Sequence, residues 1–197
     1  MKTTLTALLL ACLGPAALLP AAAAPTCTAQ SGERRAVLLE LYTSEGCDSC
    51  PPADRRLSQW KTQAGLAGRL VPLAFHVDYW DYLGWKDTLA SPDFSQRQYD
   101  YAKARGDMDV FTPQMIVNGE KQMVGNQRSE VYAVIEQSRR KSWPASLRIE
   151  DYSKEIVIEI DAGETQQEAT LWIMPVMERT SVKIDEMKVA VFGDVAV

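Results

Sequence analysis

The chain has 197 residues, of which 46% are hydrophobic and 24% charged, and its formal net charge is −5. This balance fits one folded domain with an appendage and excludes a disordered, collagen-like or membrane-embedded chain. The 21 lysines and arginines form no basic run, so nucleic acid is not expected as a partner. His76 is the one histidine of the sequence, which excludes a site built on two histidines.

Residues 1–24 have the three parts of a secretory signal peptide. A basic start at Lys2 precedes an apolar stretch from Thr3 to Leu19, and four alanines at 21–24 supply the small residues needed for cleavage. Prolines interrupt the apolar stretch, which argues against a membrane anchor. We therefore expect a cleaved signal, a periplasmic or secreted protein, and no transmembrane segment in the mature chain. Lipidation at Cys12 is an alternative.

The first half of the mature chain predicts a strand, a helix and a second strand. Residues 25–36 are polar and are expected to form an N-terminal tail. Val37–Thr43 is a short, nearly continuous apolar run, which is typical of a buried central strand. A helical pattern follows from Cys47 to about Ala64. Leu70–Val77 is a second apolar run and predicts a strand parallel to the first.

The next segment predicts a helix, a hairpin and another helix. A loop rich in tyrosine and tryptophan precedes Ser91–Arg105, where Ser91 is a typical N-cap and Gly106 a typical stop. Asn118-Gly119 between two short apolar runs indicates a tight hairpin that joins strands at 114–118 and 121–124. Ser129–Lys141 has an apolar helical face.

The resulting order, β-α-β-α-β-β-α over residues 37–141, predicts a small α/β sandwich. After residue 142 the character of the sequence changes. Apolar and polar residues alternate at 147–149 and 156–160, which predicts strands there, and Ala169–Met174 is expected to be another strand. Residues 142–197 are therefore expected to form a small, all-β C-terminal appendage. An appendage of this size is too small to fold well alone, so we expect it to pack on the first domain.

Cys47-Asp48-Ser49-Cys50 carries the clearest chemical signal. Cysteines three positions apart at a helix start share one face, and a small adjustment closes a disulfide between them. The helix N-terminus lowers the pKa of a thiol at Cys47, which would then be the exposed nucleophile, while Cys50 is shielded and resolves the mixed disulfide. A fixed structural disulfide and a metal site are the alternatives. A C-x-x-C motif inside a β-α-β unit favours redox chemistry.

At this motif the chain resembles the thioredoxin superfamily. More narrowly, three segments resemble the secreted thioredoxin-like family catalogued as domain of unknown function 1223: Glu40–Asp54, Phe75–Trp85 and Thr112–Gly119. The resemblance implies a thioredoxin fold over about residues 37–141 and a redox-active cysteine pair, and it supplies no substrate.

The resemblance also implies roles for residues around the pair. Thr112-Pro113 before a strand is similar to the superfamily's cis-proline loop, in which the proline faces the disulfide and the preceding residue receives an extended substrate. Glu40, an acid within an apolar strand, is similar to the buried carboxylate of thioredoxins and would accept the proton of Cys50. Pairing of Glu40 with Arg34 or Arg35 is the alternative.

Two further groups lie close to the motif in the expected topology. Parallel strands end at one edge of a sheet, so His76 is expected near the cysteines, either as a hydrogen-bonded core histidine, as a proton shuttle or as a metal ligand. Tyr79 and Trp80, with Tyr82, Leu83 and Trp85, are expected either to bind substrate or to cover the sheet. The spare cysteine, Cys27, is expected to be a free thiol or an intermolecular partner.

The sequence therefore favours an exported thiol-disulfide oxidoreductase of the reductase or isomerase type. Cys47, Cys50, Pro113 and Glu40 are its predicted catalytic residues, and Thr112, Tyr79 and Trp80 its predicted substrate-binding residues. Expected partners are thiols or disulfides of proteins or small molecules and a redox partner, and no cofactor is expected. The alternatives are a copper protein that uses Cys47, Cys50 and His76, and a non-catalytic interaction module.

Overall fold

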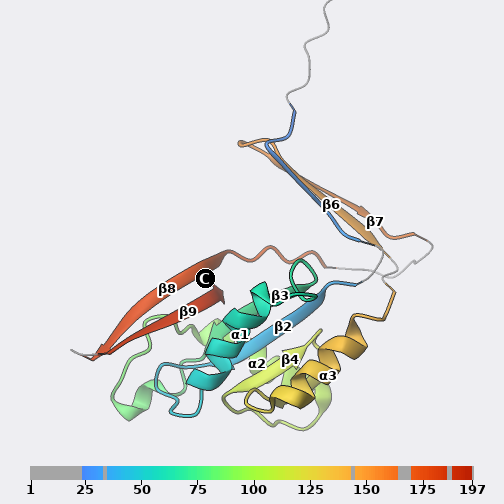
Figure 1. The fold of residues 1–197 in the computed structure, drawn as a ribbon. Coiled ribbons are helices and arrows are strands. Elements are labelled where there is room, and N and C mark those ends of the chain that lie inside the picture. The colour runs from blue at the N-terminus through green and yellow to red at the C-terminus, as the bar shows by residue number, and fades with distance from the viewer. Residues whose placement is uncertain (1–23, 33–34, 143–144, 164–169, 186–187, 197) are drawn as a thin grey trace, which may run out of the picture.

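The structure is a computed structural model that describes residues 24–32, 35–142, 145–163, 170–185 and 188–196 (Figure 1). The predicted signal peptide lies outside the described residues except for Ala24. Within the described part of the chain, no helix is long and apolar enough to span a membrane.

A six-stranded mixed sheet forms the centre of the molecule, in the order β5-β4-β2-β3-β9-β8. Strand β2 pairs in parallel with β3 and antiparallel with β4. Both central strands are largely buried, as their continuous apolar runs predict. The strand bounds are β2 Val37–Thr43, β3 Leu70–His76, β4 Gln114–Val117, β5 Lys121–Val124, β8 Val176–Asp185 and β9 Lys188–Ala196.

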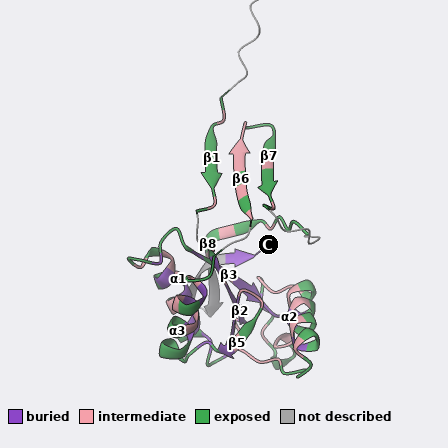
Figure 2. Ribbon diagram, turned by 90° about the vertical axis from the view of Figure 1, so that its right-hand side faces the viewer, coloured by how far each residue is buried: buried purple, intermediate pink, exposed green. Residues whose placement is uncertain are grey.

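Three α-helices, α1 Pro51–Thr62, α2 Pro92–Arg105 and α3 Arg128–Ser138, cover the two faces of the sheet (Figures 1 and 2). Because side chains alternate along a strand, β2 contributes to two cores. Leu39 and Leu41 pack with α1 and α3 on one face, whereas Tyr42 packs on the other with Phe75 and Phe94 of α2. A short 3-10 helix, η1 Asp81–Leu83, lies between β3 and α2.

The predicted order of elements over residues 37–141 is confirmed, and the fold is mixed α/β. Helix α2 begins after its N-cap Ser91 and stops at Gly106, as predicted. The hairpin at Asn118-Gly119 is also confirmed, and both residues have the positive φ that its turn requires. Helix α1 begins at Pro51 and not at Cys47, because two prolines fill its first positions and Cys50 is the N-cap.

The expected C-terminal appendage is wrong in part. Strands β8 and β9 extend the central sheet beside β3, and Val195 and Ala196 are buried in its cores. The strand expected at 169–174 is absent from residues 170–174, whose Trp172 and Ile173 are largely exposed, while residue 169 is outside the described part. An apolar run forms a strand only where a partner strand is available.

A second, three-stranded sheet, β1-β6-β7, stands apart from the central one (Figures 1 and 2). Its strands are β1 Cys27–Gln30, β6 Ser146–Asp151 and β7 Ile156–Asp161, and none of their residues is buried. The N-terminal tail expected at 25–36 therefore contains a strand, since β1 pairs antiparallel with β6. The expected packing of this sheet on the main body is also wrong.

Candidate functional site

Cys47 and Cys50 lie between the end of β2 and the start of α1, at one edge of the central sheet. They form a disulfide with a Cα–Cα distance of 5.4 Å. A tight turn at residues 44–47 positions Cys47. In this turn the Cys47 amide donates to the Ser44 carbonyl at 3.2 Å and the Gly46 amide donates to Ser44 Oγ at 3.1 Å. Cys50 then caps α1, with the amides of Ala53 and Asp54 donating to its carbonyl.

Both cysteines are buried in this oxidised state. The exposed fraction is 2% for Cys47 and zero for Cys50, so the expectation of a solvent-exposed Cys47 is wrong. The residues between them, Asp48 and Ser49, are exposed, and the Ser49 hydroxyl lies 3.6 Å from Cys47 Sγ. The pair therefore lies just beneath the surface, under a short exposed turn.

The Thr112-Pro113 peptide bond is cis, as expected, and it immediately precedes β4. Two contacts connect this loop to the cysteine turn. Trp80 Nε1 donates to Thr112 Oγ1 at 2.8 Å, and the Cβ of the same tryptophan lies 3.3 Å from the position that a Cβ on Gly46 would occupy. A Cβ on Gly125 would lie 3.1 Å from Ala53 of α1 and 3.2 Å from Pro113, so the approach of these elements requires glycine there.

Glu40 does not lie with the cysteines. Its side chain points to the face of the sheet that α2 covers, whereas α1 and the core beneath it lie on the opposite face. There it is fully buried, accepts a hydrogen bond of 2.8 Å from Tyr101 and forms an ion pair of 2.7 Å with Arg97. The expected role of Glu40 as proton acceptor for Cys50 is therefore wrong. Its ion pair is with Arg97 and not with Arg35, which pairs with Glu120, while Arg34, the other expected partner, lies outside the described residues.

Asp54 is an acidic residue of α1, on the same side of the sheet as the cysteine pair. It was not predicted as a site residue from the sequence. It lies four residues after Cys50, on the same face of α1, and accepts a hydrogen bond of 2.8 Å from the Thr43 hydroxyl at the end of β2. Burial raises the pKa of Asp54 to about 6, although the Thr43 hydrogen bond and the nearby His76 act to lower it. The signal available in the sequence was its helical spacing from Cys50.

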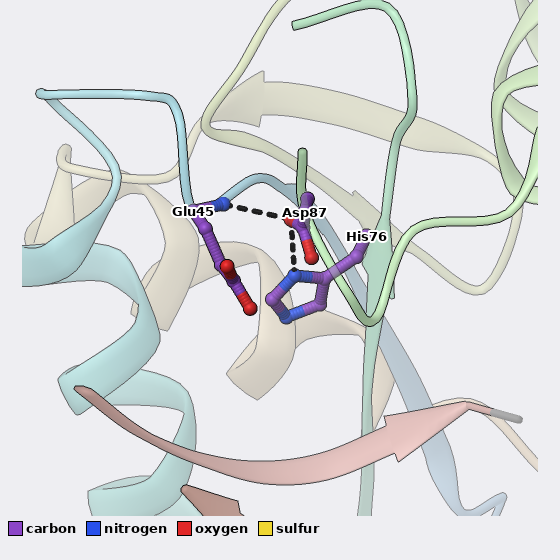
Figure 3. A group of neighbouring side chains, drawn as sticks. All are labelled: Glu45, His76 and Asp87. Atoms are coloured by element: carbon purple, nitrogen blue, oxygen red, sulfur yellow. Dashed lines mark hydrogen bonds and ion pairs between the residues drawn. The ribbon is translucent and has the colours of Figure 1, made fainter. Parts of the chain in front are cut away.

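His76 ends β3 next to Thr43, and it is fully buried. Its Nδ1 atom lies 2.8 Å from Asp87 Oδ2, and Glu45 lies beside the ring (Figure 3). Nitrogen and carboxylate oxygen atoms of these three residues lie within 4.8 Å of one another, which makes them a group able to hold a metal ion. The structure thus groups His76 with two carboxylates, whereas the sequence reading had grouped it with the cysteines.

Hydrogen bonds fix both carboxylates of this group. Asp87 accepts from the amides of Glu45 and Leu89, each at 2.8 Å, and Glu45 Oε2 accepts from Trp85 Nε1 at 2.6 Å. Burial, opposed by the Trp85 hydrogen bond, raises the pKa of Glu45. Burial also acts to raise the pKa of Asp87, but the His76 hydrogen bond and charge and the two amides outweigh it and hold that pKa below its usual range.

The aromatic loop is divided between packing and exposure. Tyr79 is half-buried and donates to Gln98 at 3.1 Å, and burial raises the pKa of its hydroxyl to about 12. Trp80 packs against the core on the α2 face and bonds to Thr112. In contrast, Tyr82 and Leu83 of η1 are 80% and 56% exposed. The exposed apolar surface of this loop is therefore formed by Tyr82 and Leu83, which follow Tyr79 and Trp80, the two loop residues predicted to bind substrate.

Comparison with known proteins identifies the family. A family model described as "Protein of unknown function (DUF1223)" matches residues 38–188. The chain belongs to this family. The matched range includes the cysteine pair, the cis-proline loop and the carboxylate-histidine group of this chain. The resemblance to this family that the sequence motifs indicated is confirmed.

A solved structure resembles this DUF1223 chain over most of its length. It is the crystal structure of a protein from Agrobacterium tumefaciens, with 31% sequence identity and a TM-score of 0.68. The similarity covers 85% of this chain and 72% of that one. A search of curated proteins finds no match for the chain.

Cys27 is an exposed free cysteine on β1. Its strand pairs with β6, where Cys27 lies opposite Asp151, and this places it in the sheet that stands apart from the cysteine pair (Figure 1). The prediction of a free thiol is confirmed, and a role as an intermolecular partner stays a prediction.

Proposed function

We propose that this DUF1223 protein is an exported thiol-disulfide oxidoreductase with a thioredoxin-like arrangement. The observation that carries the proposal is the Cys47–Cys50 disulfide at the start of α1, directly after a buried parallel strand. A reactive cysteine needs a helix N-terminus or another positive environment to stabilise its thiolate, and this position supplies the helix N-terminus. A purely structural bridge between residues three apart would close a very short loop and would add little stability.

The surroundings of the pair support an extended disulfide substrate. The loop before β4 carries Thr112 and cis-Pro113, and contacts through Gly125 hold it against α1. In the proposed complex, the backbone at Thr112 pairs with substrate, and Trp80 with the exposed Tyr82 contacts its apolar side chains. Tyr79 supports this surface through its bond to Gln98.

The proposed reaction is a dithiol-disulfide exchange. The Cys47 thiolate attacks one sulfur of the substrate disulfide, that bond breaks, and the other substrate sulfur leaves as a thiolate and takes a proton. The Cys50 thiol loses its proton and attacks the Cys47 sulfur. The Cys47–Cys50 disulfide forms, and the second substrate sulfur leaves as a thiolate. Two electrons pass to the substrate, and an external dithiol is needed to return the protein to its reduced form.

Asp54 takes the proton-transfer role that the sequence reading gave to Glu40. It lies one helical turn from Cys50 on the same face of α1, and its pKa of about 6 lets it exchange a proton near neutral pH. The burial of both cysteines requires a small opening at Cys47 before attack. We propose that this opening is a movement of the Trp80 side chain, which lies between Gly46 and Thr112.

Turnover of a disulfide substrate by the full chain tests the proposal. We expect the protein to accelerate the reduction of insulin by dithiothreitol, followed as turbidity, and we expect Cys50→Ser to abolish this activity. Cys27→Ser is the matched control, since it removes a thiol outside the pair, and it should retain full activity. Equal activity of wild type and Cys50→Ser would contradict the proposal and leave the interaction module as the function to pursue.

A further inference from the structure

We propose that Glu45, His76 and Asp87 form a divalent metal site that takes a first-row transition ion such as Zn²⁺. Three different segments supply these residues: the turn after β2, the end of β3 and the loop before α2. The site uses no sulfur atom, so it is distinct from the cysteine pair and stands whether or not the proposed redox function is correct.

The geometry of the three side chains suits one ion. Their donor atoms lie within 4.8 Å of one another, and His76 Nδ1 and Asp87 Oδ2 are 2.8 Å apart (Figure 3). Two ligands that bind the same ion at about 2.0–2.2 Å lie roughly 3–4 Å from each other. The 2.8 Å contact between His76 Nδ1 and Asp87 Oδ2 is a hydrogen bond, so a bound ion would take the place of its proton and the two atoms would separate slightly. Glu45 would supply the third ligand after a small movement of its side chain, and water would fill the remaining position.

The charges of the group call for a cation. His76 is fully buried and Asp87 is 2% exposed, and the half-buried Glu45 adds a second carboxylate. The two carboxylates accept hydrogen bonds from neutral indole, hydroxyl and amide donors, and Asp87 also bonds to the imidazole of His76. Buried carboxylates are stable when they are paired, protonated or bound to metal, and a divalent ion would balance both at once.

The hydrogen bonds around the group orient the ligands, as is typical of metal sites. Trp85 Nε1 donates to Glu45 Oε2 at 2.6 Å, and the Thr88 hydroxyl donates to Oε1 over a longer distance of 3.4 Å. The Leu89 amide donates to Asp87 Oδ1 at 2.8 Å. The Asp87 amide itself donates to Asp81 at 3.1 Å. These bonds fix the loop that carries Asp87 before any ion binds.

The donor set selects the class of metal. One imidazole and two carboxylates suit Zn²⁺, Mn²⁺ or Fe²⁺, whereas Cu⁺ prefers thiolate and thioether sulfur. The half-buried Glu45 gives the ion an entry path from the surface, next to the turn that carries Cys47. A bound ion would then lie at the same sheet edge as the disulfide.

Calorimetric titration of the oxidised, metal-free full chain with Zn²⁺ tests the site, in a Cys27→Ser background that removes the exposed thiol. We expect one ion per chain, with a Kd in the micromolar range or tighter. Glu45→Gln, which keeps the shape of a half-exposed side chain, should weaken binding at least tenfold, and Asp87→Asn should do the same. Glu130→Gln, an exposed acid on α3, is the matched control and should leave the Kd unchanged.

A second comparison separates this site from one built on cysteine. Replacing both Cys47 and Cys50 by serine should leave the Kd unchanged, since no sulfur belongs to the donor set. Circular dichroism of each variant establishes that it is folded before the titration. The proposal is overturned by an absence of binding in the folded protein, by binding that Glu45→Gln leaves unchanged, or by binding that is lost with the two cysteines.

Discussion

Cys47 and Cys50 differ in their surroundings although both are buried. Cys47 lies in a turn flanked by exposed residues, whereas Cys50 is fully enclosed at the helix start. We therefore predict that Cys50→Ser traps mixed disulfides with substrate through Cys47, and that Cys47→Ser traps few. Non-reducing gels and mass spectrometry measure the trapped complexes. Alkylation of reduced protein near pH 6 should also label Cys47 first, and faster labelling of Cys50 would reverse the two roles.

Asp48, between the cysteines, sets the expected redox potential of the pair. Its exposed carboxylate lies next to Cys47 and disfavours the thiolate, which makes the reduced form less stable and the pair less oxidising. We predict a potential nearer that of thioredoxin, about −270 mV, than that of a strong oxidant at about −120 mV. Asp48→His should raise it by tens of millivolts in equilibration with glutathione, and an unchanged value would assign control to other residues.

Asp54 should make the stability of the protein depend on pH. Its pKa is about 6 in the folded state against 3.8 for an ordinary aspartate, so between these values the folded state binds more protons. The free energy of unfolding therefore falls as the pH rises from about 4 to about 6. Asp54→Asn should remove this fall. Between about pH 4 and pH 6 the free energy of unfolding of the variant should therefore rise by about 1–2 kcal/mol relative to that of wild type, less than the full pKa shift implies because the side chain is partly solvated.

Chemical denaturation of wild type and Asp54→Asn at about pH 4 and pH 7 measures this difference directly. Any constant cost of losing the carboxylate contact with Thr43 cancels, because only the change with pH is compared. Parallel pH dependence in the two proteins would show that Asp54 titrates normally.

At the scale of elements, the alternation of side chains along strand β2 places Glu40 on the opposite face of the sheet from α1, which follows the cysteine pair. Glu40 there points toward Arg97 of α2 and away from α1. We predict that Glu40→Gln lowers the free energy of unfolding by about 1–3 kcal/mol, since it leaves a partly buried arginine without its charge partner. The proposed exchange rate of the folded protein should stay unchanged, whereas a loss of rate at constant stability would support the catalytic role first expected for Glu40.

A surface acid provides the control for this substitution. Glu120 pairs with Arg35 and Lys141 near the surface, so Glu120→Gln should cost no more than about 0.5 kcal/mol. Urea denaturation of the two variants compares a buried ion pair with exposed ones in the same chain.

The elements of the α/β core were predictable because each has a local signal. The caps of α2 and the turn at Asn118-Gly119 depend on residues a few positions apart, and the buried strands on continuous apolar runs. The three-stranded sheet was not predictable, since β1 pairs with a strand more than a hundred residues later. The extension of the central sheet by β8 and β9 is likewise a long-range pairing that alternation alone does not show.

The parts of the site that lie at strand ends could be predicted from the sequence. The parts that depend on the direction of a side chain could not. The positions of the cysteine pair, the cis-proline and His76 follow from motif and topology. Glu40 was misplaced because its direction depends on which face α1 covers. Glu45 and Asp87 were missed, since two acids in separate loops have no shared spacing that relates them to a histidine.

At the scale of the molecule, the C-terminal strands belong to the main fold. Val195 and Ala196 are buried, and β9 pairs with β3. We predict that a chain ending at residue 163 loses cooperative thermal unfolding, because the edge of β3 and the apolar groups beneath it become exposed. Deleting residues 24–32, which removes β1, should lower the Tm far less, since that strand is wholly exposed. Equal losses, measured by circular dichroism, would contradict this assignment.

The sheet β1-β6-β7 also fixes the order in which the molecule can be completed. Thr26 bonds to Asp151, 125 residues later, so β1 cannot pair with β6 until about three-quarters of the chain has been synthesised. The cysteine pair, in contrast, lies among contacts that arise early in synthesis. The disulfide can therefore close before β1 has a partner strand, while Cys27 is still on an unpaired segment of the chain.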